Sequence, residues 1–184
     1  MRVRAAIFLG LGATLLWGLR AVAVPVPGLP LVPGGPPVDN KARAAQILDA
    51  VDGGEFSNQI ALSGIIDRKD IMAMFQIESR FDPTAINEND GGPGNHAYGI
   101  GQMLASTAAD INIVDPTTLL NMEVGVRATV EYMIWIFNFL APRLGRNPTR
   151  SEWIGAYNIG IGNVLNGVLP ETYLAKHAAA KALL

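Results

Sequence analysis

Hydrophobic positions in the middle of the chain recur at the spacing of an α-helix, and one position on that face is a carboxylate. The positions i, i+3, i+4 and i+7 of a single helical face are occupied by Ile71, Met74, Phe75 and Glu78. Glu78 is therefore expected to point toward the interior or into a cleft. The helix should end before Pro83, because the residue that precedes a proline is pushed out of the helical region.

This position is unfavourable for a charged side chain. Burial disfavours the charged form of a carboxyl group, and so does the negative end of the helix dipole in the last turn. Both effects are expected to raise the pKa of Glu78, which suits a general acid. A buried glutamate paired with Arg68 or Arg80 explains the same spacing without a catalytic role, and the pattern alone does not separate the two interpretations.

Other periodic segments predict further helices, separated by turns and one long loop. Capping residues, glycines and prolines place the helices at about 39–51, 57–65, Asp67 to the Asp82-Pro83 stop, 104–111, 121–140 before Pro142, Thr149 or Ser151 to Gly160, and from Pro170 onward. The polar, glycine-containing segment 84–98 is predicted to be a loop. No run alternates with the period of a strand, so the fold class is predicted to be all-α.

The segment YMIWIFNFLA, within the helix predicted before Pro142, is apolar on almost every side. Ten residues are too few to span a bilayer, for which about 17 to 25 are needed. The segment is therefore predicted to be part of a buried central helix.

Residues 1–23 form a separate hydrophobic segment. Two arginines precede an apolar run of 15 residues, which is typical of a signal peptide and short for a membrane span. The segment ends in Ala-Val-Ala, which has the small-x-small form of a cleavage site, although Arg20 just before it is atypical. A cleaved signal peptide or a retained membrane anchor is expected, and a buried helix is the remaining interpretation.

Residues 24–37, VPVPGLPLVPGGPP, contain six of the twelve prolines in the chain. This composition predicts either a semi-rigid linker with polyproline II character or a disordered spacer. A single globular domain is then predicted over 38–184.

Composition excludes several classes of protein and site. The net charge is −2, and without residues 1–23 there are 11 basic and 16 acidic residues, a net charge of −5, so nothing indicates binding to nucleic acid. The absence of cysteine excludes a disulfide framework and a lipid-modified cysteine. The two histidines, His96 and His177, are far apart in the sequence, so no metal site is predicted.

Two further segments, AYGIGQMLASTA and GAYNIGIGN, combine glycines with polar side chains. Gly99 and Gly101 allow the backbone to bend tightly and to approach a ligand closely. Gln102 follows them with an amide that can donate and accept hydrogen bonds. Tyr157 and Asn158 lie at a predicted helix end, where a phenol and an amide could bind a sugar.

Together these motifs resemble the catalytic domain of the soluble lytic transglycosylases (SLT), a lysozyme-like fold of the goose type. The resemblance covers about residues 65–176 and depends on four motifs in order: Glu78-Ser79-x-Phe81-x-Pro83-x-Ala85, Gly99-Ile100-Gly101-Gln102, Thr107-Ala108 and Ala156-Tyr157-Asn158-x-Gly160.

The resemblance implies roles for individual residues. Glu78 matches the single catalytic acid of the family, and Ser79 matches a serine that forms a hydrogen bond with that acid. Glu171 matches the late glutamate of the family's E-T segment.

The remaining matches concern the substrate. Gln102 matches a glutamine that contacts the sugar, and Met103 follows it in the same segment. Tyr157 matches a tyrosine near the acid and the N-acetyl group, with Asn158 beside it.

The chain also departs from the family pattern. Gly101 stands where the family usually has methionine, and Leu104-Ala105 stands where it usually has methionine and proline. The loop before Gln102 is longer than usual, and Glu171-Thr172-Tyr173 is shorter than the usual E-T-x-x-Y. These differences affect the expected substrate length and the assignment of Glu171.

The function implied by the resemblance is cleavage of the β-1,4 bond between N-acetylmuramic acid and N-acetylglucosamine in peptidoglycan glycan strands. Glu78 would act as acid and then as base, the product would be a 1,6-anhydro sugar, and no cofactor would be needed. Such a protein would be exported to the periplasm or cell envelope.

Two alternatives stay open. A muramidase that hydrolyses the bond with water would need a second acid, such as Asp82, Glu88 or Asp90. A peptidoglycan-binding component of a secretion or conjugation machine, or of a phage particle within the virion, would suit an anchored N-terminus with a proline-rich stalk.

Overall fold

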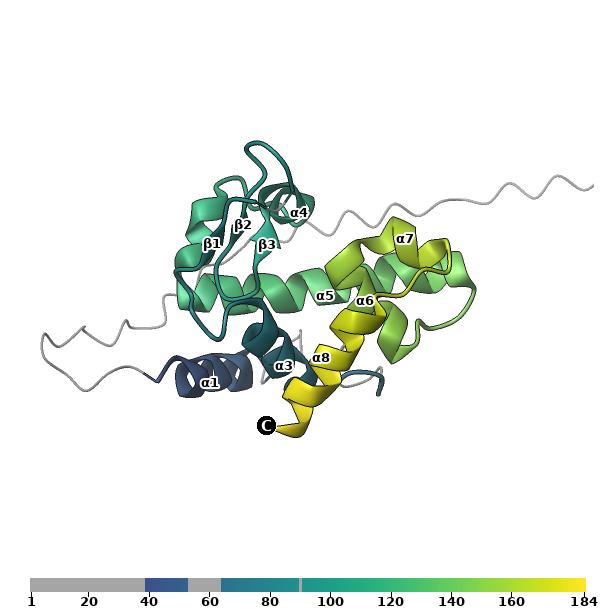
Figure 1. Ribbon diagram of the computed structural model, residues 1–184, viewed down its shortest axis with the longest axis horizontal. Coiled ribbons are helices and arrows are strands. Elements are labelled where there is room, and N and C mark those ends of the chain that lie inside the picture. The colour runs from purple at the N-terminus through teal and green to yellow at the C-terminus, as the bar shows by residue number, and fades with distance from the viewer. Residues whose placement is uncertain (1–38, 53–63, 90) are drawn as a thin grey trace, which may run out of the picture. The chain divides into compact units, whose positions relative to one another are not determined.

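A long helix, α5 (Met122–Leu144), lies at the centre of the fold (Figure 1). The computed structural model describes residues 39–52, 64–89 and 91–184. Asn121 caps α5 by accepting hydrogen bonds from two backbone amides of its first turn. By length and composition α5 could cross a membrane, but its apolar face packs against α1 (Asn40–Asp52) and α6 (Arg150–Ile159). The sequence interpretation of this segment as a buried central helix is therefore confirmed.

The C-terminal end of α5 differs from the prediction. The helix was expected to end at Leu140, but it continues through Pro142 to Leu144 and ends at Gly145, which has a left-handed φ of 67°. Near the end of a helix a proline costs only one intrahelical bond. The Arg143 guanidinium donates to the carbonyl of Phe139 at 3.0 Å and lies over the Phe139 ring, which holds the last turn together.

Helix α3 (Arg68–Glu78) begins where the sequence indicates but ends at Glu78, before the predicted stop at Asp82-Pro83, because the backbone reverses at Arg80 and Phe81. The Asp67 side chain accepts from the amide of Asp70, and the Asp70 side chain accepts from the amide of Asp67, so the predicted cap is a reciprocal capping box. Helix α1 also lies where it was predicted. The predicted helix at 57–65 falls mostly outside the described residues, as do the signal or anchor segment at 1–23 and the linker at 24–37.

Two strands of a small sheet lie in the segment 84–98 that was predicted to be a loop, and the third follows it. Strands β1 (Ile86–Asn87), β2 (Ala97–Tyr98) and β3 (Met103–Leu104) pair antiparallel in the order β1-β2-β3. These strands had no signal in the sequence, because two residues are too few to show an alternating pattern, and the chain is mostly helical as predicted. Helix α4 (Ala105–Asp110) and the 3-10 helix η1 (Pro116–Leu120) complete this part of the molecule.

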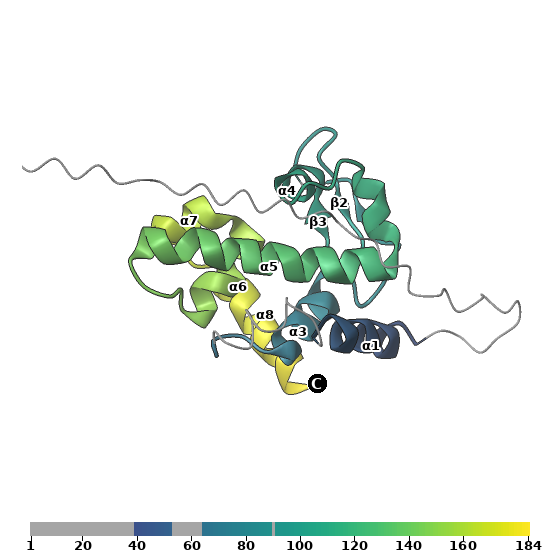
Figure 2. The same ribbon diagram turned by 180° about the vertical axis from the view of Figure 1, so that it is seen from behind.

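The C-terminal third consists of helices joined by short loops. Thr149 caps α6 with a second capping box, α6 ends at Gly160, and α7 (Ile161–Leu165) and α8 (Glu171–Ala182) follow. Helix α8 packs against α3 more extensively than any other pair of described elements. Figures 1 and 2 show α3 and α8 on one side of α5, with the strands and α4 on the other. The molecule is thus mostly helical, as predicted, with a small sheet facing the α3–α8 pair across the central helix.

Candidate active site

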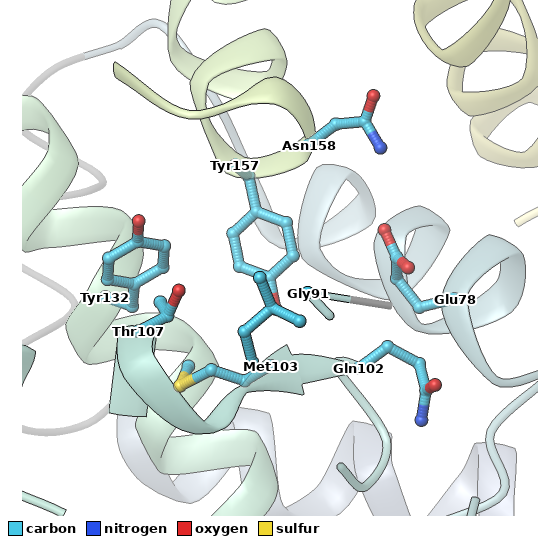
Figure 3. A pocket seen from close by; sticks show the side chains of 9 residues that line it. Glu78, Gly91, Gln102, Met103, Thr107, Tyr132, Tyr157 and Asn158 are labelled. Carbon is cyan, nitrogen blue, oxygen red and sulfur yellow. The ribbon is translucent and has the colours of Figure 1, made fainter. Parts of the chain in front are cut away.

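A pocket of about 290 Å³ lies between the small sheet and the C-terminal helices (Figure 3). Five residues singled out in the sequence line it, together with four others; the lining residues are Glu78, Gly91, Gln102, Met103, Leu104, Thr107, Tyr132, Tyr157 and Asn158. The fold therefore brings together residues from all four motifs of the sequence analysis.

Glu78 is the last residue of α3, and the backbone beyond it explains its position. Arg80 and Phe81 both have a left-handed φ, 56° and 64°, and the Phe81 amide donates back to the carbonyl of Phe75 at 3.2 Å. The Phe81 side chain is buried in the core. This tight reversal ends the helix at Glu78 and leaves its carboxylate at the pocket.

The hydroxyl of Tyr173 donates a hydrogen bond to Oε1 of Glu78 at 2.5 Å. Burial raises the pKa of the Tyr173 phenol, and the negative charge of Glu78 raises it further, so the phenol keeps its proton and remains a donor. Tyr173 is absent from the residues that the sequence singled out for the site. The aromatic residue after Glu171-Thr172 was its only signal, because the contact joins residues 95 positions apart.

Tyr157 approaches the pocket from α6. Its hydroxyl donates to the carbonyl of Gly101 at 2.6 Å, and its ring meets that of Tyr132 edge to face at 5.7 Å. Burial raises the pKa of Tyr157, and the charge of Glu78 adds to that effect. Tyr157 is therefore a neutral phenol in the pocket that Glu78 also lines.

The turn from Gly99 to Gln102 forms one wall. Gly99 has φ 72°, and Gln102 has φ 48°, which is uncommon for a residue with a side chain. The side-chain amide nitrogen of Gln102, Nε2, donates to the carbonyls of Gly99 at 2.9 Å and Ala85 at 3.1 Å. In Figure 3 this amide points away from the Glu78 carboxyl group, so in this structure Gln102 braces the turn.

The other residues singled out in the sequence occupy different places. Met103 is buried in β3, and Figure 3 shows it across the pocket from Asn158, which is exposed at the end of α6. Ser79 donates to the carbonyl of Ile100 at 2.8 Å, which ties the end of α3 to the turn. Glu171 is exposed at the first position of α8 and is not among the residues that line the pocket.

Arg68 has partners other than Glu78. Its guanidinium forms an ion pair with Asp49 on α1 at 2.7 Å and donates to the carbonyl of Ala45 at 3.1 Å. Across the residues that the structure describes, no group of three or more acidic, histidine or cysteine side chains could hold a metal ion.

Comparison with protein families identified a match. The model of the transglycosylase SLT domain matches residues 55–176. Comparisons with curated proteins and with solved structures found no match for the chain.

Proposed function

The chain belongs to the transglycosylase SLT domain family and therefore to a group of peptidoglycan-acting, lytic transglycosylase-like proteins, and we propose that it cleaves the β-1,4 bond between N-acetylmuramic acid and N-acetylglucosamine with formation of a 1,6-anhydro sugar. The observation that carries the proposal is the Glu78 carboxyl group, which lines the pocket and is oriented by the hydroxyl of Tyr173.

In the first step, protonated Glu78 gives its proton to the glycosidic oxygen as the bond to the anomeric carbon breaks. General acid catalysis of this kind contributes about 10²–10⁴-fold to the rate. The Tyr173 hydrogen bond fixes the direction of the carboxyl group, so that its proton meets the leaving oxygen in one defined geometry.

In the second step, the positive charge at the anomeric carbon is stabilised by the N-acetyl group of the substrate, with Tyr157 beside it. Glu78, now a carboxylate, takes the proton of the 6-hydroxyl, and that oxygen bonds to the anomeric carbon. The leaving sugar has gained one proton and the 6-hydroxyl has lost one, so Glu78 is protonated again and no water is consumed.

The composition of the pocket favours this route over hydrolysis. Among the described residues that line the pocket, Glu78 is the only carboxylic acid. The Asp82 side chain accepts hydrogen bonds from the amide and hydroxyl of Thr84 at 2.8 and 2.7 Å, so it serves a turn. Glu88 is exposed, and Asp90 lies outside the described residues. We also propose a location in the cell envelope, where the substrate lies.

Mass spectrometry of muropeptides released from purified sacculi tests the proposal. The full chain should release anhydro-muramyl products, and Glu78→Gln should reduce their release about 10²–10⁴-fold. Glu123→Gln, which removes a carboxylate from a surface ion pair with Arg127, is the matched control and should retain activity. Products with reducing ends would instead indicate a muramidase. Sacculus binding without any product would indicate a binding component.

A further inference from the structure

The side-chain amide of Gln102 donates both of its protons to the backbone. Its Nε2 atom lies 2.9 Å from the carbonyl oxygen of Gly99 and 3.1 Å from that of Ala85. A carbonyl only accepts, so both contacts require nitrogen at this position, and together they use its two protons. The amide can therefore offer a ligand only its oxygen, and not the donor and acceptor together that the sequence indicated.

The two carbonyls belong to separate segments of the chain, because Ala85 precedes β1 and Gly99 follows β2. The backbone amide of Gly99 donates to the same Ala85 carbonyl at 2.8 Å, and the backbone amide of Gln102 donates to the Gly99 carbonyl at 3.1 Å. Gln102 has φ 48°, and a residue with a side chain keeps this conformation only where its surroundings fix it. The two side-chain bonds of Gln102 are part of what holds the turn in this conformation.

The turn presents two successive carbonyls to residues next to and within the pocket. The Ile100 carbonyl accepts from the hydroxyl of Ser79, which directly follows Glu78 at the end of α3. The Gly101 carbonyl accepts from the hydroxyl of Tyr157 on α6. A Cβ atom at Gly101 would lie 2.8 Å from that hydroxyl oxygen, so the phenol can reach the carbonyl because this position has no side chain. Two adjacent peptide units thus connect the end of α3 with α6.

We propose that Gln102 is a positioning residue that sets the separation between the Glu78 carboxyl group and the Tyr157 phenol. Its two side-chain bonds fix the turn, and the two carbonyls of the turn fix the residue after Glu78 and the phenol. A small displacement of either group lowers the rate, because both must meet the same sugar in one geometry. The Gln102 amide acts through the backbone, since in Figure 3 it points away from the Glu78 carboxyl group. The proposal rests on the proposed function, because it concerns the spacing of the groups that carry that reaction.

Two substitutions of similar size test the proposal. Gln102→Glu keeps an acceptor but loses both donors, and Gln102→Met loses the donors and the acceptor. Both variants should lower kcat about 10- to 100-fold with little change in KM, which corresponds to the loss of two hydrogen bonds. Gln46→Glu makes the same change at an exposed position of α1 and is the matched control, which should leave kcat and KM unchanged.

A direct contact between the Gln102 oxygen and the sugar predicts a different result. The Gln102→Glu variant would then keep the kcat and KM of the wild type, because a carboxylate still accepts a hydrogen bond. Only Gln102→Met would bind the substrate more weakly. This pattern, or a change in KM without a change in kcat in both variants, would overturn the positioning role.

A double-mutant cycle with Ser79→Ala tests the connection through the turn. Ser79→Ala removes the hydroxyl that donates to the Ile100 carbonyl at 2.8 Å, so this bond no longer ties the end of α3 to the turn. Gln102→Met should therefore lower kcat by a smaller factor in the Ser79→Ala background than in the wild type. The same factor in both backgrounds would overturn the proposal.

The same cycle measured by urea denaturation separates this proposal from the proposed function and shows whether each variant is folded. If the wild-type chain releases no anhydro product, the proposed function fails, and with it the role of Gln102 in that reaction. The coupling between Gln102 and Ser79 should then still appear in the free energy of unfolding. If the wild-type chain is active but the coupling is absent from both kcat and unfolding, only the positioning role fails.

Discussion

Two carboxylates on the same helix, Asp70 and Glu78, face the same partner helix, α8, in different surroundings. Asp70 has no exposed surface; Arg150 donates to its Oδ1 from two nitrogens at 3.0 and 2.5 Å, and Lys181 contacts its Oδ2 at 2.9 Å. Glu78, two turns later, receives the Tyr173 hydroxyl and lines the pocket. The comparison shows how one interface can hold a structural carboxylate at one end and, under the proposed function, the catalytic acid at the other.

The α8 side of this interface follows a helical repeat. Tyr173, His177 and Lys181 are spaced at i, i+4 and i+8, so all three point toward α3. The His177 Nε2 lies 2.9 Å from the carbonyl of Asp70, which only accepts, so Nε2 carries the proton. Its Nδ1 lies 3.2 Å from a guanidinium nitrogen of Arg150, which only donates, so Nδ1 is the acceptor. The contacts thus fix a neutral imidazole between the two carboxylates.

The largest difference between Asp70 and Glu78 should appear in the free energy of unfolding. Asp70→Asn is expected to lower the free energy of unfolding by about 3–5 kcal/mol, because it leaves the partly buried charge of Arg150 without its carboxylate and removes one of the two carboxylates that contact Lys181. Urea denaturation of the full chain measures this change. Asp49→Asn, which breaks the exposed pair with Arg68, is the matched control and should cost no more than about 1 kcal/mol. Equal losses of unfolding free energy in the two variants would contradict a structural role for the ion pairs of Asp70.

A change next to Glu78, at the other end of the interface, should appear in enzyme activity. Tyr173→Phe is expected to lower kcat roughly 10- to 100-fold, the loss of a hydrogen bond to a charged group. That bond favours the carboxylate form of Glu78, so without it the carboxyl group keeps its proton to higher pH and the pH–activity profile should move upward. Anhydro-product release across a pH series measures both effects. Tyr98→Phe, outside the pocket lining, is the control, and an unmoved profile in Tyr173→Phe would count against the orienting role.

The smallest expected effect is a loss of unfolding stability at low pH, caused by His177 in the middle of the α3–α8 interface. Burial lowers the pKa of His177 from its ordinary value of 6.5, while contact with Asp70 opposes this and the charges of Arg150 and Lys181 reinforce it. The unfolded chain therefore binds a proton below pH 6.5 more readily than the folded chain does. The contribution of His177 to the free energy of unfolding should be fully present above pH 6.5. Below that pH the free energy of unfolding should fall by up to about 1.4 kcal/mol per pH unit.

Urea denaturation at neutral pH and about one unit below 6.5 measures this loss. The Asp67 carboxyl group also contacts Lys181. Those contacts lower its pKa below the ordinary value of 3.8, so Asp67 does not titrate between neutral pH and about one unit below 6.5. His177→Gln should abolish the loss, and His96→Gln, in the loop before β2, should retain it. A wild-type chain that is equally stable at both pH values would show that His177 does not report on this interface.

Much of the local structure could be predicted from the sequence. The cap at Asp67, the cap at Thr149 and the break at Gly160 all depend on residues within one or two helical turns, and each lies where it was predicted. The end of α5 and the three short strands could not be predicted. Pro142 is tolerated because of a side-chain contact near the helix end, and two-residue strands pair through segments that show no period of their own.

The sequence by itself determined the helices and placed Glu78 on the inner face of one of them, because capping and periodicity act over a few residues. It did not distinguish Asp70 from Glu78 as the carboxylate that positive charges neutralise. Only the tertiary structure decided this, since Arg150 and Lys181 reach Asp70 from 80 and 111 positions away. The same packing placed Tyr173 against Glu78 and the Tyr157 hydroxyl against the Gly101 carbonyl, because hydrogen bonds between distant residues depend on which elements lie side by side and not on the order of residues along the chain.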